Sequence, residues 1–108
     1  MDEATVESVR AVVAAIPAGR VATYGDVAEL ARAPSPRLVG RVLAEDGHDI
    51  PWHRVIRADG TPAPHLAREQ LSRLRGEGVP AVDGRVDLRG YRWRKARPAE
   101  AAGLFEFG

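Results

Sequence analysis

The sequence predicts a compact, mainly α-helical domain that contains a helix-turn-helix and at most a small β element. Three observations support this prediction. The chain has 108 residues, which is enough for one modest hydrophobic core. Apolar residues recur at helical spacing near its start. A short connection at residues 33–36 joins two further helical patterns.

Two helices are predicted before this connection. The first is indicated by aliphatic residues that share one helical face, namely Val6, Val9, Val12, Val13 and Ile16. Pro-Ala-Gly at 17–19 should end it. After an extended link at 21–22, residues 23–26 (Thr-Tyr-Gly-Asp) resemble a capping box, which is a typical helix start. The buried face of the second helix should consist of Val27, Ala28, Leu30 and Ala31.

A third helix should follow the connection at 33–36. Ser35 is a suitable N-cap and Pro36 would occupy the first helical position, so we expect a helix to about Ala44. Residues 24–44 therefore make a helix-turn-helix. This pattern alone is compatible with DNA binding and with the many helix pairs that bind no DNA.

The second half of the chain is predicted to contain one strand and one helix. Residues 52–57 (Trp-His-Arg-Val-Ile-Arg) alternate like a short strand. A proline-containing loop at 61–66 should precede a fourth helix at about 67–75, which Gly76 and Gly78 would end.

The end of the chain should contain a packed segment and a tail. Four apolar residues are expected to pack this segment on the core: Val86, Leu88, Tyr91 and Trp93. The Ala-, Pro- and Glu-rich residues after Lys95 favour a flexible tail. We therefore expect one domain over residues 1–95 and a tail over 96–108.

Composition argues against several classes of site. The chain has no cysteine, so it can form neither disulfides nor thiolate metal sites, and it has no cysteine nucleophile. Its three histidines are scattered, which argues against zinc, and we expect neither metal nor cofactor. No apolar run approaches the ~20 residues that span a membrane. The acidic start Met-Asp-Glu lacks the cationic region of a secretory signal, which favours the cytoplasm.

The middle of the chain is rich in arginine, although the formal net charge is only +1. The arginines concerned are Arg37, Arg41, Arg54, Arg57, Arg68, Arg73 and Arg75. Clustered arginines can neutralise DNA phosphates. A solvated basic face is the alternative explanation.

Three sequence motifs help to decide whether these arginines bind DNA. They are GRVATYGDVA at 19–28, RLVGRVL at 37–43 and PWHRVI at 51–56. Together they resemble the DNA-binding C-terminal domain of O6-alkylguanine-DNA alkyltransferases, which carry Pro-Cys-His-Arg-Val around the acceptor cysteine. Here Trp52 stands at the acceptor position. This replacement resembles the alkyltransferase-like proteins, which carry out no alkyl transfer. The resemblance covers residues 4–93 and implies a winged-helix-like fold.

The resemblance also implies how DNA would be bound. In this family the second helix of the helix-turn-helix enters the minor groove, whereas most such motifs read the major groove. Arg37 matches an arginine that fills the gap left by the extruded nucleotide, and Tyr24 matches a tyrosine that crowds the 3′ phosphate of the target. Gly40 would let the helix backbone approach the groove. Arg41 would either contact a phosphate or face solvent.

A pocket for the extruded base is implied around Trp52, whose indole offers a flat wall for a purine or its alkyl group. Val55 belongs to the same motif and is expected at this pocket. The loop at 61–68 should form the far wall. A basic residue of this loop should contact the lesion base, and either His65 or Arg68 could do so.

His53 and Glu69 resemble the relay that activates the cysteine in the repair enzymes. Because the chain has no thiol, we expect them to remain as a hydrogen-bonded structural pair. Arg54 should brace the loops around the pocket.

The implied function is non-enzymatic recognition of double-stranded DNA containing O6-alkylguanine, with the damaged nucleotide flipped and flagged for nucleotide excision repair proteins. We expect a monomer in the cytoplasm, associated with the nucleoid when bound to DNA, with no membrane contact. Three rival hypotheses remain: a sequence-specific transcription regulator, an enzyme that uses His53 and Glu69, and a structural remnant without lesion preference.

Overall fold

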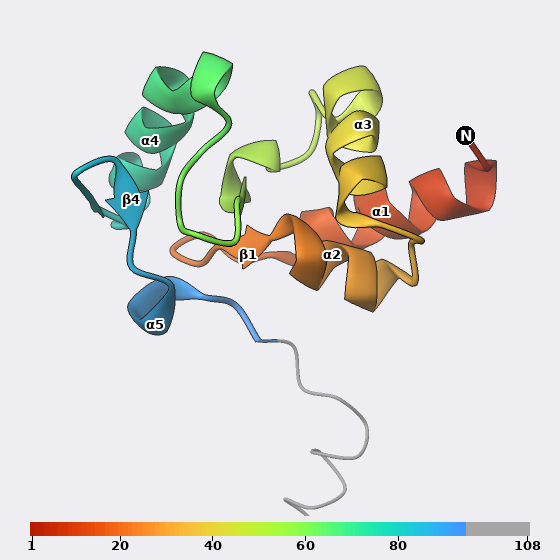
Figure 1. Ribbon diagram of the computed structural model, residues 1–108, viewed down its shortest axis with the longest axis horizontal. Helices are drawn as coiled ribbons and strands as arrows, with labels where there is room; N and C mark the ends of the chain where they lie inside the picture. Colours follow the sequence, from red (N-terminus) through yellow and green to blue (C-terminus); the bar gives the residue numbers. More distant parts are fainter. Residues whose placement is uncertain (95–108) are drawn as a thin grey trace, which may run out of the picture.

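The computed structural model describes residues 1–94. The elements, among which η1 and η2 are 3-10 helices, are α1 (Glu3–Ala15), β1 (Ala22–Thr23), α2 (Tyr24–Ala31), α3 (Pro36–Asp46), η1 (Trp52–Arg54), β2 (Val55–Ile56), η2 (Pro64–Leu66), α4 (Ala67–Gly76), β3 (Ala81–Val82), β4 (Arg85–Val86) and α5 (Leu88–Tyr91). Helices α1, α2 and α3 pack together in one half of the molecule, whereas α4 and the β3–β4 hairpin lie in the other (Figure 1). The predicted mainly helical fold is confirmed. The predicted flexible tail lies outside the described residues.

The helix-turn-helix begins as the sequence predicts. Oγ1 of Thr23 accepts a hydrogen bond from the backbone N–H of Asp26 at 3.0 Å, and the Asp26 carboxylate accepts one from the N–H of Thr23 at 3.1 Å. This reciprocal pair satisfies two amides that the start of α2 would otherwise leave unpaired. Ser35 caps α3 by accepting from the N–H of Leu38 at 3.2 Å. Helix α3 continues two residues beyond the predicted end, to Asp46.

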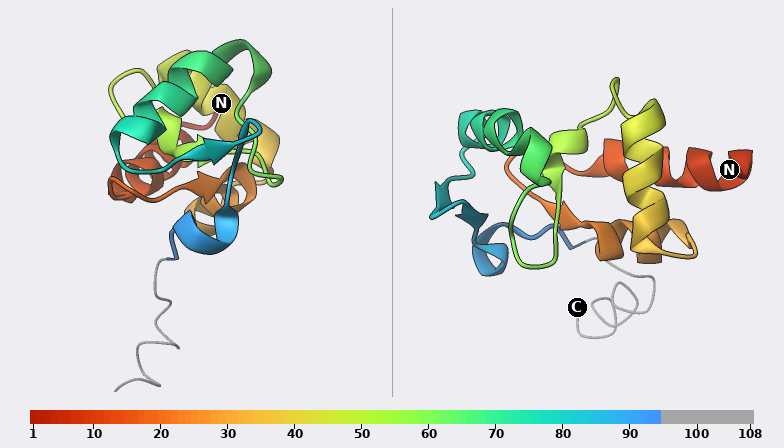
Figure 2. Two further views of the ribbon diagram at one scale, coloured as in Figure 1. Left: turned by 90° about the vertical axis from the view of Figure 1, so that its left-hand side faces the viewer. Right: turned by 45° about the horizontal axis from the view of Figure 1, so that its top comes forward.

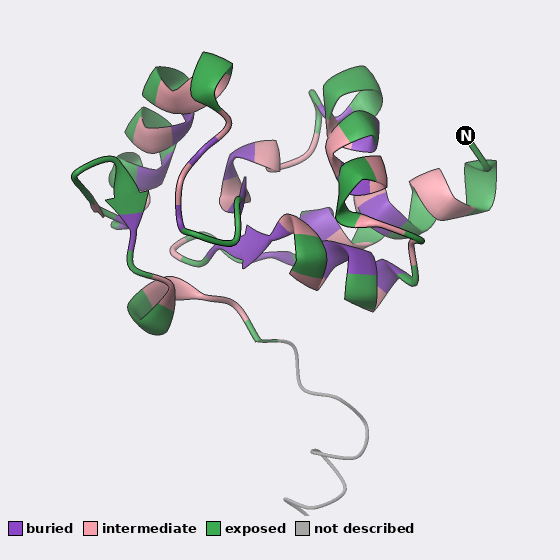
Figure 3. Ribbon diagram, in the orientation of Figure 1, coloured by how far each residue is buried: buried purple, intermediate pink, exposed green. Residues whose placement is uncertain are grey.

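Two hydrophobic cores stabilise the two halves. The first packs α1, α2, α3 and parts of both β1 and β2, and its fully buried members include Val9, Val13, Val27, Val39 and Val42. The second consists of Val21, Ile56, Leu74, Val79 and Val86. Figure 3 shows that buried residues gather on the inward sides of the helices. Within residues 1–94, no helix combines the length and apolar character needed to cross a membrane.

Strands β1 and β2 connect the two cores. They pair in parallel, with Ala22 opposite Val55 and Thr23 opposite Ile56. Successive side chains of a strand point to opposite faces. Val55 accordingly packs in the first core and Ile56 in the second.

The predicted strand at 52–57 was too long. Residues 52–54 form the 3-10 turn η1, and only Val55 and Ile56 pair as a strand. The N–H of Arg54 donates to the carbonyl of Pro51 at 3.1 Å, and the N–H of Val55 donates to the carbonyl of Trp52. These local bonds close the chain into a turn, so the alternating pattern does not reflect an extended backbone.

A hairpin and a short helix complete the described chain. Asp83 and Gly84 connect β3 to β4 with φ of 52° and 76°, a conformation that Asp-Gly favours in two-residue hairpins. As predicted, Val86 is buried, Leu88 and Tyr91 pack against the second core, and Trp93 packs against the first.

Candidate nucleic-acid interface and base pocket

A cavity of about 520 Å³ lies between α3 and α4. These helices stand on the same side of the molecule, with η1 between them (Figure 2). One wall and the rear of the cavity are formed by Tyr24, Gly40, Leu43, Ala44, His48 and Trp52. The opposite wall is formed by Ala63, His65, Leu66, Glu69 and Arg73. Among residues 1–94, no group of three or more potential metal ligands occurs here or elsewhere.

Trp52 is held in the cavity wall by contacts on two sides. Its ring meets the His53 ring edge-on, with centroids 6.1 Å apart and planes at 86°. The guanidinium carbon of Arg73 lies over the indole, 5.4 Å from the ring centroid, within the distance of a cation–π contact. The indole is half-buried, so it remains available to a molecule that enters the cavity.

Tyr24 and Gly40 meet at the junction of α2 and α3. A Cβ atom placed on Gly40 would lie 3.8 Å from Cε1 of Tyr24, so the tyrosine ring packs closely against this part of α3. Burial raises the pKa of the Tyr24 phenol, and the nearby Arg57 opposes this shift. The phenol therefore stays protonated at neutral pH and can donate a hydrogen bond.

The outward face of α3 carries two exposed arginines. Arg37 and Arg41 are one helical turn apart, and Gly40 lies between them on the same side. Val39 and Val42 occupy the opposite, buried side. Arg41 forms an ion pair with Glu45 at 3.1 Å. Arg37 makes no hydrogen bond or ion pair within residues 1–94, so its guanidinium is available to an external partner.

The predicted pairing of His53 with Glu69 was wrong. Nε2 of His53 lies 2.9 Å from Oε2 of Glu77, whereas Glu69 forms an ion pair with Arg73 at 3.0 Å. Glu69 lies in the first turn of α4 on the cavity side. Glu77 follows the last residue of α4, and this end of the helix lies against η1.

Glu77 also binds Arg54 through both carboxylate oxygens, at 3.0 Å from Nε and 2.7 Å from Nη2. The Arg54 guanidinium, opposed by burial and assisted by His53, lowers the pKa of Glu77 from 4.5 to about 2. Nη1 of Arg54 donates to the backbone carbonyl of Ile16 at 2.8 Å. Arg54 therefore ties the end of α4 to the end of α1. Nδ1 of His53 is buried without a hydrogen-bond partner in the described part of the chain.

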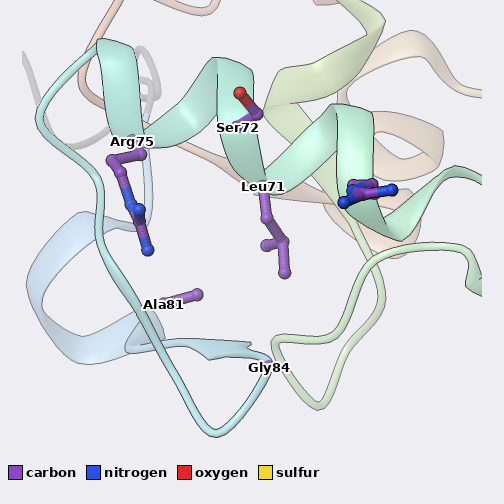
Figure 4. Close-up of a pocket in the computed structure, with 6 residues that line it drawn as sticks. Leu71, Ser72, Arg75, Ala81 and Gly84 are labelled. Atoms are coloured by element: carbon purple, nitrogen blue, oxygen red, sulfur yellow. The ribbon is translucent and has the colours of Figure 1, made fainter.

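Two residues predicted at the base pocket lie elsewhere. Val55 is fully buried in the first core, because its strand position points it away from the cavity. Arg68 borders a second hollow of about 310 Å³ on another face of α4. Leu71 and Arg75 of α4 point toward this hollow, which the β3–β4 hairpin closes (Figure 4). His65 does line the cavity.

The basic residue of the far wall that the sequence analysis missed is Arg73. Leu66, Glu69 and Arg73 follow one another at helical spacing and line the cavity together. Arg68 and Arg75 lie on a different face of the same helix. The same spacing, read from the sequence, could have indicated Arg73 once Leu66 was placed at the cavity.

Comparison with known proteins identifies the family. The family model described as "6-O-methylguanine DNA methyltransferase, DNA binding domain" matches residues 4–79. The chain belongs to this family. An Escherichia coli relative named DNA base-flipping protein is 44% identical over 88 residues, which cover 76% of this chain and 68% of the relative. Alkyltransferase-like protein 1 of Schizosaccharomyces pombe is 34% identical over 92 residues, which cover 73% and 84% of the two chains.

A solved structure of a family member supports the fold. The structure of S. pombe Atl1 in complex with damaged DNA containing O6-carboxymethylguanine matches with a TM-score of 0.80 and 28% identity. The match covers 88% of this chain and 99% of the other. The resemblance to alkyltransferase-like proteins and to the DNA-binding domain of alkyltransferases is therefore confirmed.

Proposed function

We propose that this chain binds double-stranded DNA that carries O6-alkylguanine, turns the damaged nucleotide out of the helix and holds it in the cavity beside Trp52 without changing it chemically. The observation that carries the proposal is the cavity itself, which adjoins the outward face of α3 and has an indole in its wall. The relatives named for base flipping, and Atl1 in complex with damaged DNA, support it.

The cavity fits a single modified base. Its volume of about 520 Å³ lies in the range of about 300 to 1,000 Å³ that is typical of small-molecule pockets. Leu43, Ala44 and Leu66 offer apolar surface, and Trp52 offers a ring on which a purine can stack. Alkylation at O6 weakens base pairing, so extruding the lesion costs less than extruding an undamaged guanine.

The outward face of α3 would approach DNA from the minor groove. Gly40 presents no side chain there, and Arg37 and Arg41 flank it with positive charge. In this arrangement Arg37 enters the gap in the base stack, because a guanidinium is planar, always charged and able to stack. The Tyr24 hydroxyl would contact the phosphate beside the turned-out nucleotide.

The chain lacks the cysteine on which alkyl transfer by the repair enzymes depends. The thiolate is the reactive form of cysteine, and the sequence contains no cysteine. His53 and Glu77 hold each other and Arg54 in place. We therefore propose that the bound lesion is passed on unrepaired, and on the family resemblance we propose nucleotide excision repair as the recipient.

A binding titration tests the proposal. A duplex with one O6-methylguanine is compared with its undamaged twin in several sequence contexts and at several salt concentrations. We expect preference for the lesion in every context. The logarithm of the binding constant should fall linearly with the logarithm of salt concentration, by about 0.9 for each phosphate contact.

Other outcomes would favour the rival hypotheses. Tight binding to one undamaged sequence would favour a transcription regulator, and equal binding to all duplexes would favour a structural remnant. A released base or a transferred alkyl group would favour an enzyme.

A further inference from the structure

The α4 wall of the cavity carries two opposite charges. Arg73 is the single guanidinium among the lining residues of the described chain, and Glu69 is the single carboxylate. They lie one helical turn apart, with Nη2 of Arg73 at 3.0 Å from Oε1 of Glu69. The guanidinium carbon lies 5.4 Å from the centroid of the Trp52 ring. Arg73 is therefore directed at the place where we propose that a base and its O6 substituent bind.

Arg73 has hydrogen-bonding capacity to spare. Its hydrogen bond to Glu69 uses one nitrogen, Nη2, and an arginine side chain has five N–H donors. Both side chains of the pair are about half exposed, at 51% and 54%. Solvent screens such a pair, so it holds Arg73 weakly. A second carboxylate could bind the remaining donors without breaking the bond to Glu69.

We propose that Arg73 makes the pocket select O6 substituents that end in an anionic group. This inference rests on the proposed lesion binding. A guanine that stacks on Trp52 would carry its O6 substituent along the α4 wall, toward the guanidinium. There a terminal carboxylate can accept a bidentate, charge-assisted pair of hydrogen bonds from the planar guanidinium. A neutral substituent of the same size gains only the apolar contacts and a weaker hydrogen bond.

Glu69 moderates this selection. Its carboxylate neutralises part of the charge of Arg73 and repels a second carboxylate that comes close. Removing the charge of Glu69 should therefore strengthen the preference for an anionic substituent, whereas removing the charge of Arg73 should abolish it. The opposite signs of the two effects distinguish this arrangement from a general loss of pocket shape.

The test compares two lesions of equal size in one duplex sequence. One duplex carries O6-carboxymethylguanine and the other O6-carbamoylmethylguanine, its neutral amide. The ratio of their dissociation constants is measured for the wild type and for Arg73→Gln, Arg73→Lys, Glu69→Gln and Arg75→Gln. Because both duplexes have the same backbone, the ratio cancels changes in phosphate binding. Arg75→Gln is the matched control, since it removes the same charge from another face of α4.

The wild type should bind the carboxymethyl lesion about threefold to tenfold more tightly than the amide, as expected for a charge-assisted contact that solvent partly screens. Arg73→Gln should bring the ratio to about one, Arg73→Lys should retain part of it, and Glu69→Gln should raise it. Arg75→Gln should leave it unchanged.

Two results would overturn the inference. One is a wild-type ratio of one or less, and the other is an undiminished ratio in Arg73→Gln. In either case, preserved binding of O6-methylguanine over guanine would leave the proposed function standing. Loss of all lesion preference in the wild type would overturn both.

Discussion

Oε2 of Glu77 lies 2.9 Å from Nε2 of His53, and the same carboxylate binds Arg54 through both oxygens. One side chain beyond the end of α4 therefore fixes two consecutive residues of the Pro-Trp-His-Arg-Val motif. Since Trp52 is the next residue toward the N-terminus, this carboxylate also fixes the position of the cavity wall.

Glu77→Gln should destabilise the protein at neutral pH. The pKa of Glu77 is lowered from 4.5 to about 2 in the folded chain, so the ionised carboxylate stabilises the folded state above pH 4.5. This stabilisation is lost as the pH falls from 4.5 to about 2, because in this range the unfolded state binds a proton that the folded state does not. We expect the substitution to lower the free energy of unfolding at pH 7 by about 3 kcal/mol, measured by urea denaturation.

The matched control is Glu69→Gln. Its carboxylate belongs to a half-exposed ion pair, so its loss should change the free energy of unfolding by less than about 1 kcal/mol. The difference between wild type and Glu77→Gln should shrink steadily toward pH 2. A difference that is constant over this range would show that the charge of Glu77 does not stabilise the fold.

Gly40→Ala should separate folding from DNA binding. The added methyl group would lie in ordinary contact with Tyr24, at 3.8 Å, and alanine favours helix over glycine by about 1 kcal/mol. The free energy of unfolding should therefore stay the same or rise. Lesion binding should weaken by about 1–3 kcal/mol if the backbone of α3 lies against the groove, because a methyl group would overfill that contact. Unchanged binding in a titration would mean that this face of α3 does not approach DNA.

Arg37→Ala should reduce lesion binding and nucleotide extrusion. Arg37 has no partner within residues 1–94 and is exposed, so its removal should leave the free energy of unfolding nearly unchanged. We expect binding to weaken by about 1–3 kcal/mol, as for a lost stacking contact. A fluorescent base analogue opposite or beside the lesion would report extrusion. Arg89→Ala is the control, because this exposed arginine lies in α5; an equal loss in both variants would reflect charge alone.

Trp52→Cys should not restore efficient alkyl transfer, although it recreates the motif of the repair enzymes. A thiol at neutral pH is only a few per cent thiolate without activation. The pair of His53 with Glu77, with Nδ1 of His53 unpartnered in the described chain, could activate a nearby thiol, but the cavity is shaped around an indole that also contacts Arg73. A misplacement near 1 Å can slow attack by on the order of a hundredfold. DNA with a radiolabelled methyl group on guanine O6 provides the assay. Rapid, stoichiometric labelling of the variant would show that Trp52 alone separates this chain from an active enzyme.

Sequence reasoning succeeded where the determining interactions are local. The starts of α2 and α3 depend on side chains that bond amides three residues away, at Thr23, Asp26 and Ser35. Such short-range patterns are visible in the sequence itself. The position of Trp52 in the cavity wall was predicted from the family motif. Composition and periodicity alone do not indicate where in the fold this residue lies.

Sequence reasoning failed where a residue's partner lies far away in the sequence, and where the rotation of a helix about its axis decides which residues face the cavity. Glu77 lies 24 residues from His53, and nothing in the spacing distinguishes it from Glu69. Choosing between Arg68 and Arg73 required the rotation of α4 about its axis, which depends on the burial of Gln70 and Leu74. Val55 was assigned to the pocket because it belongs to the motif, but neighbouring strand residues face opposite sides.

The two walls of the cavity belong to segments that pack in different hydrophobic cores. Gly40 and Leu43 belong to a helix of the first core, whereas Leu66 and Arg73 belong to a segment anchored by Leu74 in the second. The two halves are joined by the paired strands β1 and β2, whose residues pack in both cores, and by side-chain bonds such as that of Arg54 to the carbonyl of Ile16. We expect a small shift of one half against the other to widen the cavity more readily than repacking of either core would. We therefore expect the proposed base pocket to accept substituents of different sizes, whereas a pocket enclosed by a single core would have to be repacked for each.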